Sequence, residues 1–177
     1  MGILQGGRRI ASLALIIVSV ALAGCGAGEN VTPGSLEAAR RLWELSGIRD
    51  YDLEWKSTGP NSAHYFVTVR GGEVRSIESM GRDGSRHEVR PAAPQFYSVD
   101  GLFTVISDEL VQLREARPFG QPKGTNVVMR FDPDTKQGYP RSYHRDVLGT
   151  PQSLAIEVLS LRPVGTPPGR APTAARP

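Results

Sequence analysis

The chain contains a single cysteine, Cys25, which follows a basic start and an apolar run. Arg8 and Arg9 precede about 13 mostly apolar residues at positions 10–22. This run is shorter than the roughly 20 residues that a membrane-spanning helix needs. A basic start, a short apolar core and small residues before a cleavage point are typical of a secretory signal peptide. Residues 1–24 are therefore predicted to be a signal peptide, and the remaining 153 residues must fold without a disulfide.

The residues around the cysteine, Leu22-Ala23-Gly24-Cys25, resemble the lipobox of bacterial lipoproteins. The resemblance implies that the Cys25 thiol receives a diacylglyceryl group, that the chain is cut before this residue, and that the new amino group is acylated. It implies a location at the bacterial cell membrane or outer membrane, facing the periplasm or the exterior. Two or more acyl chains anchor firmly, because each buried methylene contributes about 0.8 kcal/mol. The alternatives are an uncleaved anchor or an ordinary secretory signal.

Two segments beside the predicted domain lack apolar periodicity. Residues 25–31 are mostly small and polar, which favours a flexible tether after the lipidated cysteine. Residues 163–177 are rich in proline, and such a stretch cannot bury enough surface to offset its ordering entropy, so a disordered tail is predicted. Residues 32–162 are predicted to be one domain, because about 130 residues can bury roughly two-thirds of their unfolded surface.

Two helices are predicted. Thr32 is a typical N-cap with Pro33 at the first helical position, and Gly47 is a typical stop, which predicts a helix over 33–46. A second helix begins after Ser98 and ends near Arg114. Its apolar residues recur at steps of three and four and form one stripe: Val99, Leu102, Phe103, Ile106, Leu110 and Leu113. The acidic pair Asp108-Glu109 is expected on the outward face of that helix.

The strands are predicted from alternation of apolar and polar residues. They are expected at 51–56, 64–70, 73–80, 127–131, 139–146 and 153–161, with a further short strand at 86–90. Gly71-Gly72 is a hairpin signal, because both glycines accept a positive φ. The predicted fold class is α+β, an antiparallel sheet of about five to seven strands with two helices packed on one face. The predicted element order is α-β-β-β-(β)-α-β-β-β.

Several short motifs stand in a fixed order along the domain. They are a Trp before the first predicted strands, Gly71-Gly72, Tyr97-Ser98-Val99-Asp100-Gly101-Leu102-Phe103, Phe131-Asp132-Pro133 and Gly138-Tyr139-Pro140. Together they resemble the bacterial family described as "domain of unknown function 6174", over about Leu42 to Leu161. Members of that family are commonly secreted or lipid-anchored, and many carry a cysteine pair near the second strand. Here that stretch reads His64-Tyr65-Phe66-Val67, so no disulfide or metal role of such a pair carries over.

Composition and spacing favour no metal, cofactor or catalytic residue. Without the signal peptide the formal net charge falls from +3 to +1, which removes the electrostatic case for nucleic acid binding. Asp132 and Asp134 do not begin an EF-hand loop, because Lys136 stands at the fifth position. There is no Gly-x-Ser-x-Gly motif for a serine nucleophile. The histidines are not spaced as a local zinc motif: His64, His87 and His144.

One cluster combines basic and aromatic residues. Arg141, Tyr143 and Arg145 stand at alternate positions and would share one face of a strand. Tyr and Arg are common anchors at interfaces, so this face is a candidate for binding anionic sugars or a protein partner. The other interpretation is a solvent face on which the cations extend along apolar surface.

The sequence therefore predicts a lipid-anchored cell-envelope protein with Cys25 as its attachment point. Its expected activity is that of a non-enzymatic binding or structural module that meets an envelope protein or the cell-wall matrix. Two alternatives stay open. One is an extracytoplasmic enzyme whose site is assembled from distant residues, and the other is an inhibitor-like module that blocks an enzyme cleft.

Overall fold

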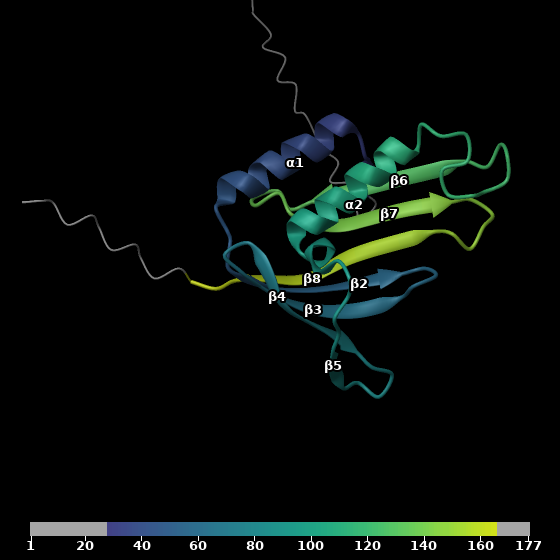
Figure 1. Ribbon diagram of the computed structural model, residues 1–177. Helices are drawn as coiled ribbons and strands as arrows, with labels where there is room; N and C mark the ends of the chain where they lie inside the picture. Colours follow the sequence, from purple (N-terminus) through teal and green to yellow (C-terminus); the bar gives the residue numbers. More distant parts are fainter. Residues whose placement is uncertain (1–27, 166–177) are drawn as a thin grey trace, which may run out of the picture.

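The fold consists of two helix-and-meander segments joined edge to edge in one sheet (Figure 1). The structure, a computed structural model, describes residues 28–165. Helix α1 (Pro33–Ser46) precedes strands β2 (Tyr51–Thr58), β3 (Ala63–Arg70) and β4 (Glu73–Met80), and helix α2 (Val99–Gln112) precedes β6 (Val127–Pro133), β7 (Pro140–Val147) and β8 (Leu154–Pro163). The pairing of β2 with β8 joins the two meanders. All neighbouring strands are antiparallel, which confirms the predicted α+β class.

Helix α1 begins and ends as its sequence predicts. The Thr32 side chain accepts a hydrogen bond from the Ser35 N–H, and the Ser35 hydroxyl accepts one from the Thr32 N–H, which completes a capping box. The helix ends at Gly47, whose φ of 65° is readily adopted only by glycine. Its buried residues, Leu36, Ala39 and Trp43, lie on the face that packs on the sheet.

Helix α2 carries the predicted apolar stripe into the core. Ser98 is the N-cap, and its hydroxyl accepts a hydrogen bond from the Gly101 N–H at 3.1 Å. Four stripe residues are at most 1% exposed: Val99, Leu102, Phe103 and Ile106. The helix ends at Gln112, two residues before the predicted end, where the chain turns away toward Pro118.

Both helices lie on one face of the sheet, which creates an inner face and an outer face (Figure 1). On β2 the inner side chains Tyr51, Leu53 and Trp55 are buried. The Tyr51 hydroxyl accepts a hydrogen bond from the Val99 N–H at 3.1 Å and so connects β2 to the start of α2. Burial raises the pKa of this hydroxyl to about 12. The core therefore lies between the helices and the inner face.

The sheet has eight strands, one more than the five to seven predicted. The unexpected strand is β1 (Glu29–Asn30), which pairs with Arg130 and Phe131 of β6. The Val31 N–H extends this pairing with a hydrogen bond to the Met129 carbonyl at 3.0 Å. The segment 28–31 is therefore held on the sheet instead of serving as a tether. A strand of two exposed polar residues is held by backbone hydrogen bonds alone, so periodicity could not reveal it.

The opposite edge holds the short strand that the sequence suggested. Strand β5 (Arg86–Glu88) pairs with β4, so the final order is β1-β6-β7-β8-β2-β3-β4-β5. A 3₁₀ helix, η1 (Pro94–Tyr97), leads from β5 into α2. Both edges of the sheet thus carry short strands, a device that limits edge-to-edge pairing between copies of a protein.

Some predictions concern residues outside the described range. The signal peptide at 1–24 and the lipidation site Cys25 lie there, as does the tail from residue 166 onward. At the boundary, β8 continues to Pro163, one residue beyond the predicted end of the domain. No helix within residues 28–165 has the length and hydropathy required to cross a membrane.

Candidate binding site

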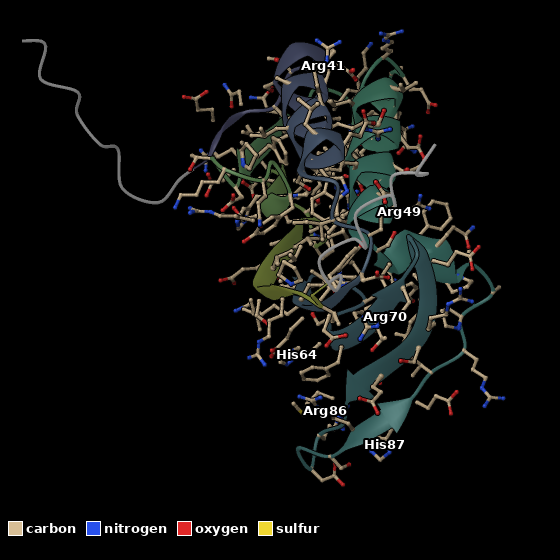
Figure 2. All side chains as sticks on the ribbon, turned by 90° about the vertical axis from the view of Figure 1, so that its left-hand side faces the viewer. Arg41, Arg49, His64, Arg70, Arg86 and His87 are labelled. Atoms are coloured by element: carbon tan, nitrogen blue, oxygen red, sulfur yellow. The ribbon has the colours of Figure 1, made fainter. Side chains whose placement is uncertain are left out.

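The outer face of the sheet is polar, and neither helix of residues 28–165 covers it; we call it the open face. Figure 2 shows His64 and Arg86 together toward one end of the molecule, far from Arg41 of α1. On β2, Asp52 and Glu54 alternate with the buried core residues and therefore point to the open face. The register places Glu54 beside Phe66 of β3 and beside Ser160 of β8. Residues more than 100 positions apart thus meet on this surface.

A shallow groove of about 250 Å³ crosses the open face from β8 to β5. Its polar lining consists of three carboxylates, two guanidinium groups and three hydroxyls, with one aromatic ring: Asp52, Glu54, Glu78, Arg86, Arg162, Thr68, Ser76, Ser160 and Phe66. Donors and acceptors of hydrogen bonds are therefore mixed along the groove. Because the backbone groups of the central strands are already paired within the sheet, only side chains can contact a ligand here.

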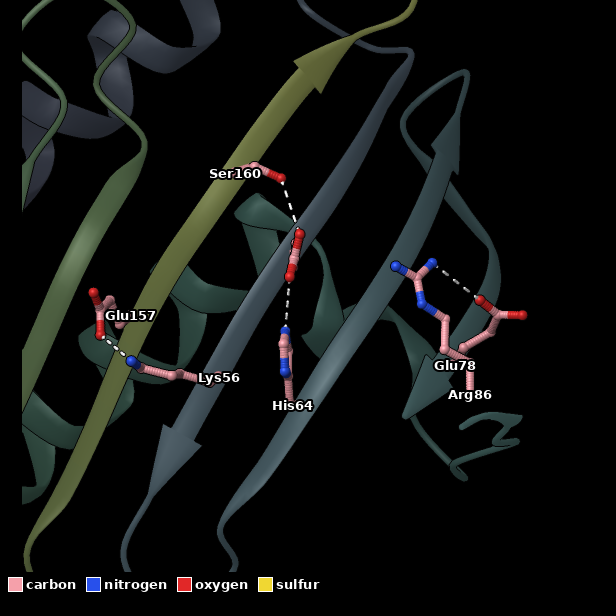
Figure 3. A network of polar contacts seen from close by, with 7 residues as sticks. Lys56, His64, Glu78, Arg86, Glu157 and Ser160 are labelled. Atoms are coloured by element: carbon pink, nitrogen blue, oxygen red, sulfur yellow. Dashed lines mark hydrogen bonds and ion pairs between the residues drawn. The ribbon is translucent and has the colours of Figure 1, made fainter. Parts of the chain in front are cut away.

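A chain of polar contacts crosses the three central strands (Figure 3). His64 Nε2 lies 2.9 Å from Glu54 Oε1, and the Ser160 hydroxyl donates to Glu54 Oε2 over 3.4 Å. Beside this chain, Lys56 Nζ lies 2.7 Å from Glu157 Oε2. The His64 and Glu54 side chains are 28% and 29% exposed, so solvent and ligand can reach this carboxylate.

The aromatic ring of the groove is covered by cationic and polarisable neighbours. The Arg86 guanidinium lies over the Phe66 ring, 3.4 Å from its centroid, and the His64 ring stacks at 4.7 Å. Glu78 contacts the same guanidinium at 3.8 Å (Figure 3). Cation–π contact holds Arg86 across the groove and restricts its rotamers. One wall of the groove is thus partly preorganised.

Three groups in the groove have no side-chain partner. Within residues 28–165, the hydroxyls of Thr68 and Ser76 and the guanidinium of Arg162 form no side-chain hydrogen bond or ion pair. Their hydrogen-bonding capacity is available to a ligand or to solvent. Together with the exposed atoms of Glu54, these groups give the groove several polar contacts that it can offer to a ligand.

The three residues predicted from sequence to share a binding face are separated by the structure. Arg141 is exposed and pairs with Asp132 at 2.7 Å, whereas Tyr143 is fully buried under α2. The register shifts beside Pro133, so that Arg141 is the extra residue of a bulge. Arg145 lies inward with Tyr143. Alternation of residues along the strand predicted that all three share one surface. The bulge separates Arg141 from the other two residues, and α2 covers Tyr143 and Arg145.

Tyr143 and Arg145 instead join a buried carboxylate of α2. The Tyr143 hydroxyl donates to Glu109 Oε2 at 2.6 Å, and Arg145 pairs with Glu109 Oε1. Burial raises the pKa of the Glu109 carboxyl, and it also raises that of the Tyr143 hydroxyl. Glu109 was expected to face outward with Asp108. Its spacing of three from the buried Ile106 was the signal that it lies at the core side.

Neighbouring residues occupy the remaining polar groups of this buried cluster. The Arg145 guanidinium lies 4.1 Å from the centroid of the Phe119 ring, and its Nη2 donates to the Gln152 carbonyl at 2.9 Å. Both Glu109 oxygens and both Arg145 terminal nitrogens are therefore occupied. This arrangement connects α2 to β7 and to the β7–β8 turn, so its role is structural.

The remaining histidines do not assemble a metal site. Within residues 28–165, no three His, Cys, Asp or Glu side chains are grouped closely enough to hold a metal ion. His87 Nε2 lies 2.6 Å from the Ser85 hydroxyl in an exposed turn, and the same hydroxyl lies 2.6 Å from Asp83 Oδ1. Hydrogen bonds from Ser85 hold the pKa of Asp83 below its usual value. His87 Nε2 also lies 3.9 Å from Asp83 Oδ1, and both side chains are more than 60% exposed. The three residues therefore form a solvent-exposed, hydrogen-bonded turn that does not line the groove of the open face.

The motifs that carry the family resemblance make packing contacts. Trp43 Nε1 donates to Asp100 Oδ1 at 3.1 Å, which connects α1 to the first turn of α2. At Gly101 a Cβ atom would lie 2.3 Å from the Gln95 carbonyl oxygen, so only glycine fits against η1. Gly138 packs equally closely on α1. These residues hold the helices on the sheet and do not line the groove.

We expect Asp100→Ala to lower the free energy of unfolding by about 1–2 kcal/mol. The substitution removes the acceptor of the Trp43 indole N–H and a negative charge at the helix N-terminus. Urea unfolding followed by tryptophan fluorescence measures the loss. Asp108→Ala is the matched control on the exposed side of the same helix and should change stability by less than about 0.5 kcal/mol. Equal effects of the two variants would contradict the role given to the Trp43 contact.

Comparison with known protein families and curated proteins found no match for this chain. The arrangement of the described residues therefore carries the functional argument, and the site that it defines is a mixed polar groove on an uncovered sheet face.

Proposed function

We propose that this protein is a lipid-anchored cell-envelope protein that acts as a non-enzymatic binding module, with the open-face groove as its binding surface. The lipobox-like sequence ending at Cys25 supports the anchor. The observation that carries the binding role is the groove itself, which brings charged and hydroxyl side chains from β2, β3, β4, β5 and β8 onto one uncovered surface. The partner is an envelope protein or a cell-wall polymer in the periplasm or at the cell exterior, the compartment into which a signal peptide directs export.

The groove suits binding better than acid–base chemistry. Its carboxylates are held by neighbours: Glu54 by His64 and Ser160, and Glu78 by Arg86. Carboxylates engaged in this way present their remaining lone pairs as fixed acceptors. The free hydroxyls of Thr68 and Ser76 add donors at neighbouring positions. A rigid sheet presents these groups at little conformational cost, which favours recognition.

The binding role is tested by photo-crosslinking in cells of the natural host. A benzoylphenylalanine side chain replaces Ser76 in the groove or, as the matched control, Ser107 on α2. We expect a reproducible light-dependent adduct from position 76, its loss on adding Phe66→Ala, and no such adduct from position 107. The digested adduct is identified by mass spectrometry as peptide or glycan. Equal labelling from both positions, or an adduct that Phe66→Ala leaves unchanged, would refute the groove as the binding surface.

The anchor is tested separately through Cys25. We expect Cys25→Ala to leave an uncleaved precursor without lipid, whereas the parent protein begins at residue 25 and carries the added mass of its acyl groups. Intact-mass spectrometry of protein purified from membranes measures both quantities. An unmodified sulfur in the parent, or a variant that matures like the parent, would show that the protein is not a lipoprotein.

A further inference from the structure

The N-terminal end of the described chain is fixed at one edge of the sheet. Strand β1 pairs with β6, with Glu29 opposite Phe131 and Asn30 opposite Arg130. Gly28 lies against the backbone of Phe131 so closely that a Cβ atom would come within 2.8 Å of its carbonyl group. The chain direction from Asn30 to Gly28 leads toward the end of β6, where the β6–β7 turn begins. The position at which the chain leaves the sheet is therefore defined.

Only a short stretch separates this position from the proposed lipid. Cys25 and Gly28 are three residues apart, and consecutive Cα atoms are 3.8 Å apart, so their Cα atoms are at most about 11 Å from each other. The eight-stranded sheet is wider: seven steps of about 4.8 Å separate β1 from β5, or roughly 30 Å. An attachment at Cys25 therefore holds the β1 edge closer to the lipid than the β5 edge.

The edge near this position also carries free cations. Arg130 of β6 and Lys136 of the β6–β7 turn are exposed and form no ion pair within residues 28–165. Arg141 is exposed beside them, paired with Asp132. Unpaired Lys and Arg side chains close to a bilayer are attracted by the phosphates and anionic headgroups of its surface.

We propose that the β1–β6 edge and the β6–β7 turn face the lipid surface, and that the β4–β5 edge points away from it (Figure 1). This inference rests on the proposed lipid attachment at Cys25 and adds an orientation to it. The groove begins at β8 and extends to β5, so four of its five strands lie in the membrane-distal half of the sheet. The open face is thus presented to partners in the aqueous compartment and is not pressed on the anchoring bilayer.

The orientation is tested with the full acylated protein in vesicles of phosphatidylethanolamine and phosphatidylglycerol. Because acylation blocks the only native thiol, a fluorophore can be placed on Lys136→Cys or, as the matched control, on Arg82→Cys in the β4–β5 turn. Both positions are exposed basic residues in turns. Lipids with a nitroxide in the headgroup quench fluorophores at the membrane surface. We expect loss of most of the fluorescence at position 136 and little loss at position 82.

A second variant tests whether the short connection causes the difference. Insertion of 20 Gly and Ser residues between Gly26 and Ala27 gives a connection with a mean span of about 25 Å, which allows the domain to turn. We expect this insertion to reduce quenching at position 136. Acylated protein with equal quenching at both positions, or stronger quenching at 82, overturns the orientation while the anchor stands. Protein without acyl mass overturns both proposals.

Discussion

Gly138→Ala is expected to lower the free energy of unfolding by about 3–5 kcal/mol, as the sum of backbone strain and overpacking. Gly138 has a φ of 80°, which L-residues with a side chain rarely adopt. It also packs against the backbone of α1, where a Cβ atom would lie 2.2 Å from the Ala39 carbonyl oxygen and 2.8 Å from the Trp43 nitrogen. Backbone atoms cannot rotate away, so α1 or the β6–β7 turn must shift. Chemical unfolding in urea measures the loss.

Gly47→Ala is the matched control for this prediction. Gly47 has a similar φ of 65°, but nothing lies within 4 Å of a Cβ atom built there. The control therefore contains the strain without the clash, and we expect it to cost about 1 kcal/mol. Similar losses in the two variants would show that the close contact between the β6–β7 turn and α1 is absent. A shifted α1 would also change the fluorescence of Trp43, which lies on its buried face.

The elements with strong local signals could be predicted from the sequence. Helix α1 agrees with its prediction at both ends, because Thr32 and Gly47 supply the caps directly. The stripe of α2 is also confirmed, since four of its six residues are almost completely buried. Hairpins joined by glycines define β3 and β4 in the same way. In each case the signal lies within a few residues of the element that it specifies.

The errors occur where a contact involves residues that are distant in sequence. Strand β1 is held by the backbone of β6, about 100 residues later, so its own side chains carry no pattern. In the sequence, Tyr143 and Arg145 resemble residues of an exposed polar face. In the structure, α2 covers them, and both contact Glu109. The groove could not be predicted because it requires the β2–β8 pairing. Hydrophobic periodicity specifies which face of a strand is buried, but it does not specify what lies on that face.

Arg145→Met is expected to lower the free energy of unfolding at pH 8 by about 3–5 kcal/mol, because it leaves a buried carboxylate without its counter-ion. The Glu109 and Arg145 side chains are only 12% and 13% exposed. Methionine has similar volume, so the loss reflects charge more than packing. Thermal and urea unfolding at a fixed pH measure it.

Arg141→Met provides a control on the same strand. Arg141 and Asp132 form an ion pair of which the side chains are 55% and 37% exposed, so solvent screens their interaction. We expect this variant to lose less than about 1 kcal/mol. A second control, the double variant Glu109→Gln/Arg145→Met, removes both charges and keeps an acceptor for the Tyr143 hydroxyl. It should recover a large part of the loss, because no uncompensated charge remains buried.

The pH dependence separates an electrostatic loss from a packing loss. Burial raises the pKa of Glu109 in the folded state, so the folded protein holds this proton more tightly than the unfolded chain does. The contribution of such a group to stability is greatest at low pH and falls as the pH rises through the folded pKa.

Removal of Arg145 raises the pKa of Glu109 further, because the lowering effect of the Arg145 charge is lost. Part of the Arg145→Met loss should therefore return when the pH is lowered from 8 to 5, because a raised pKa makes the buried carboxyl easier to neutralise as the pH falls. A loss that is equal at pH 5 and pH 8 would mean that Arg145 supports the fold through its packing on Phe119 and not through Glu109.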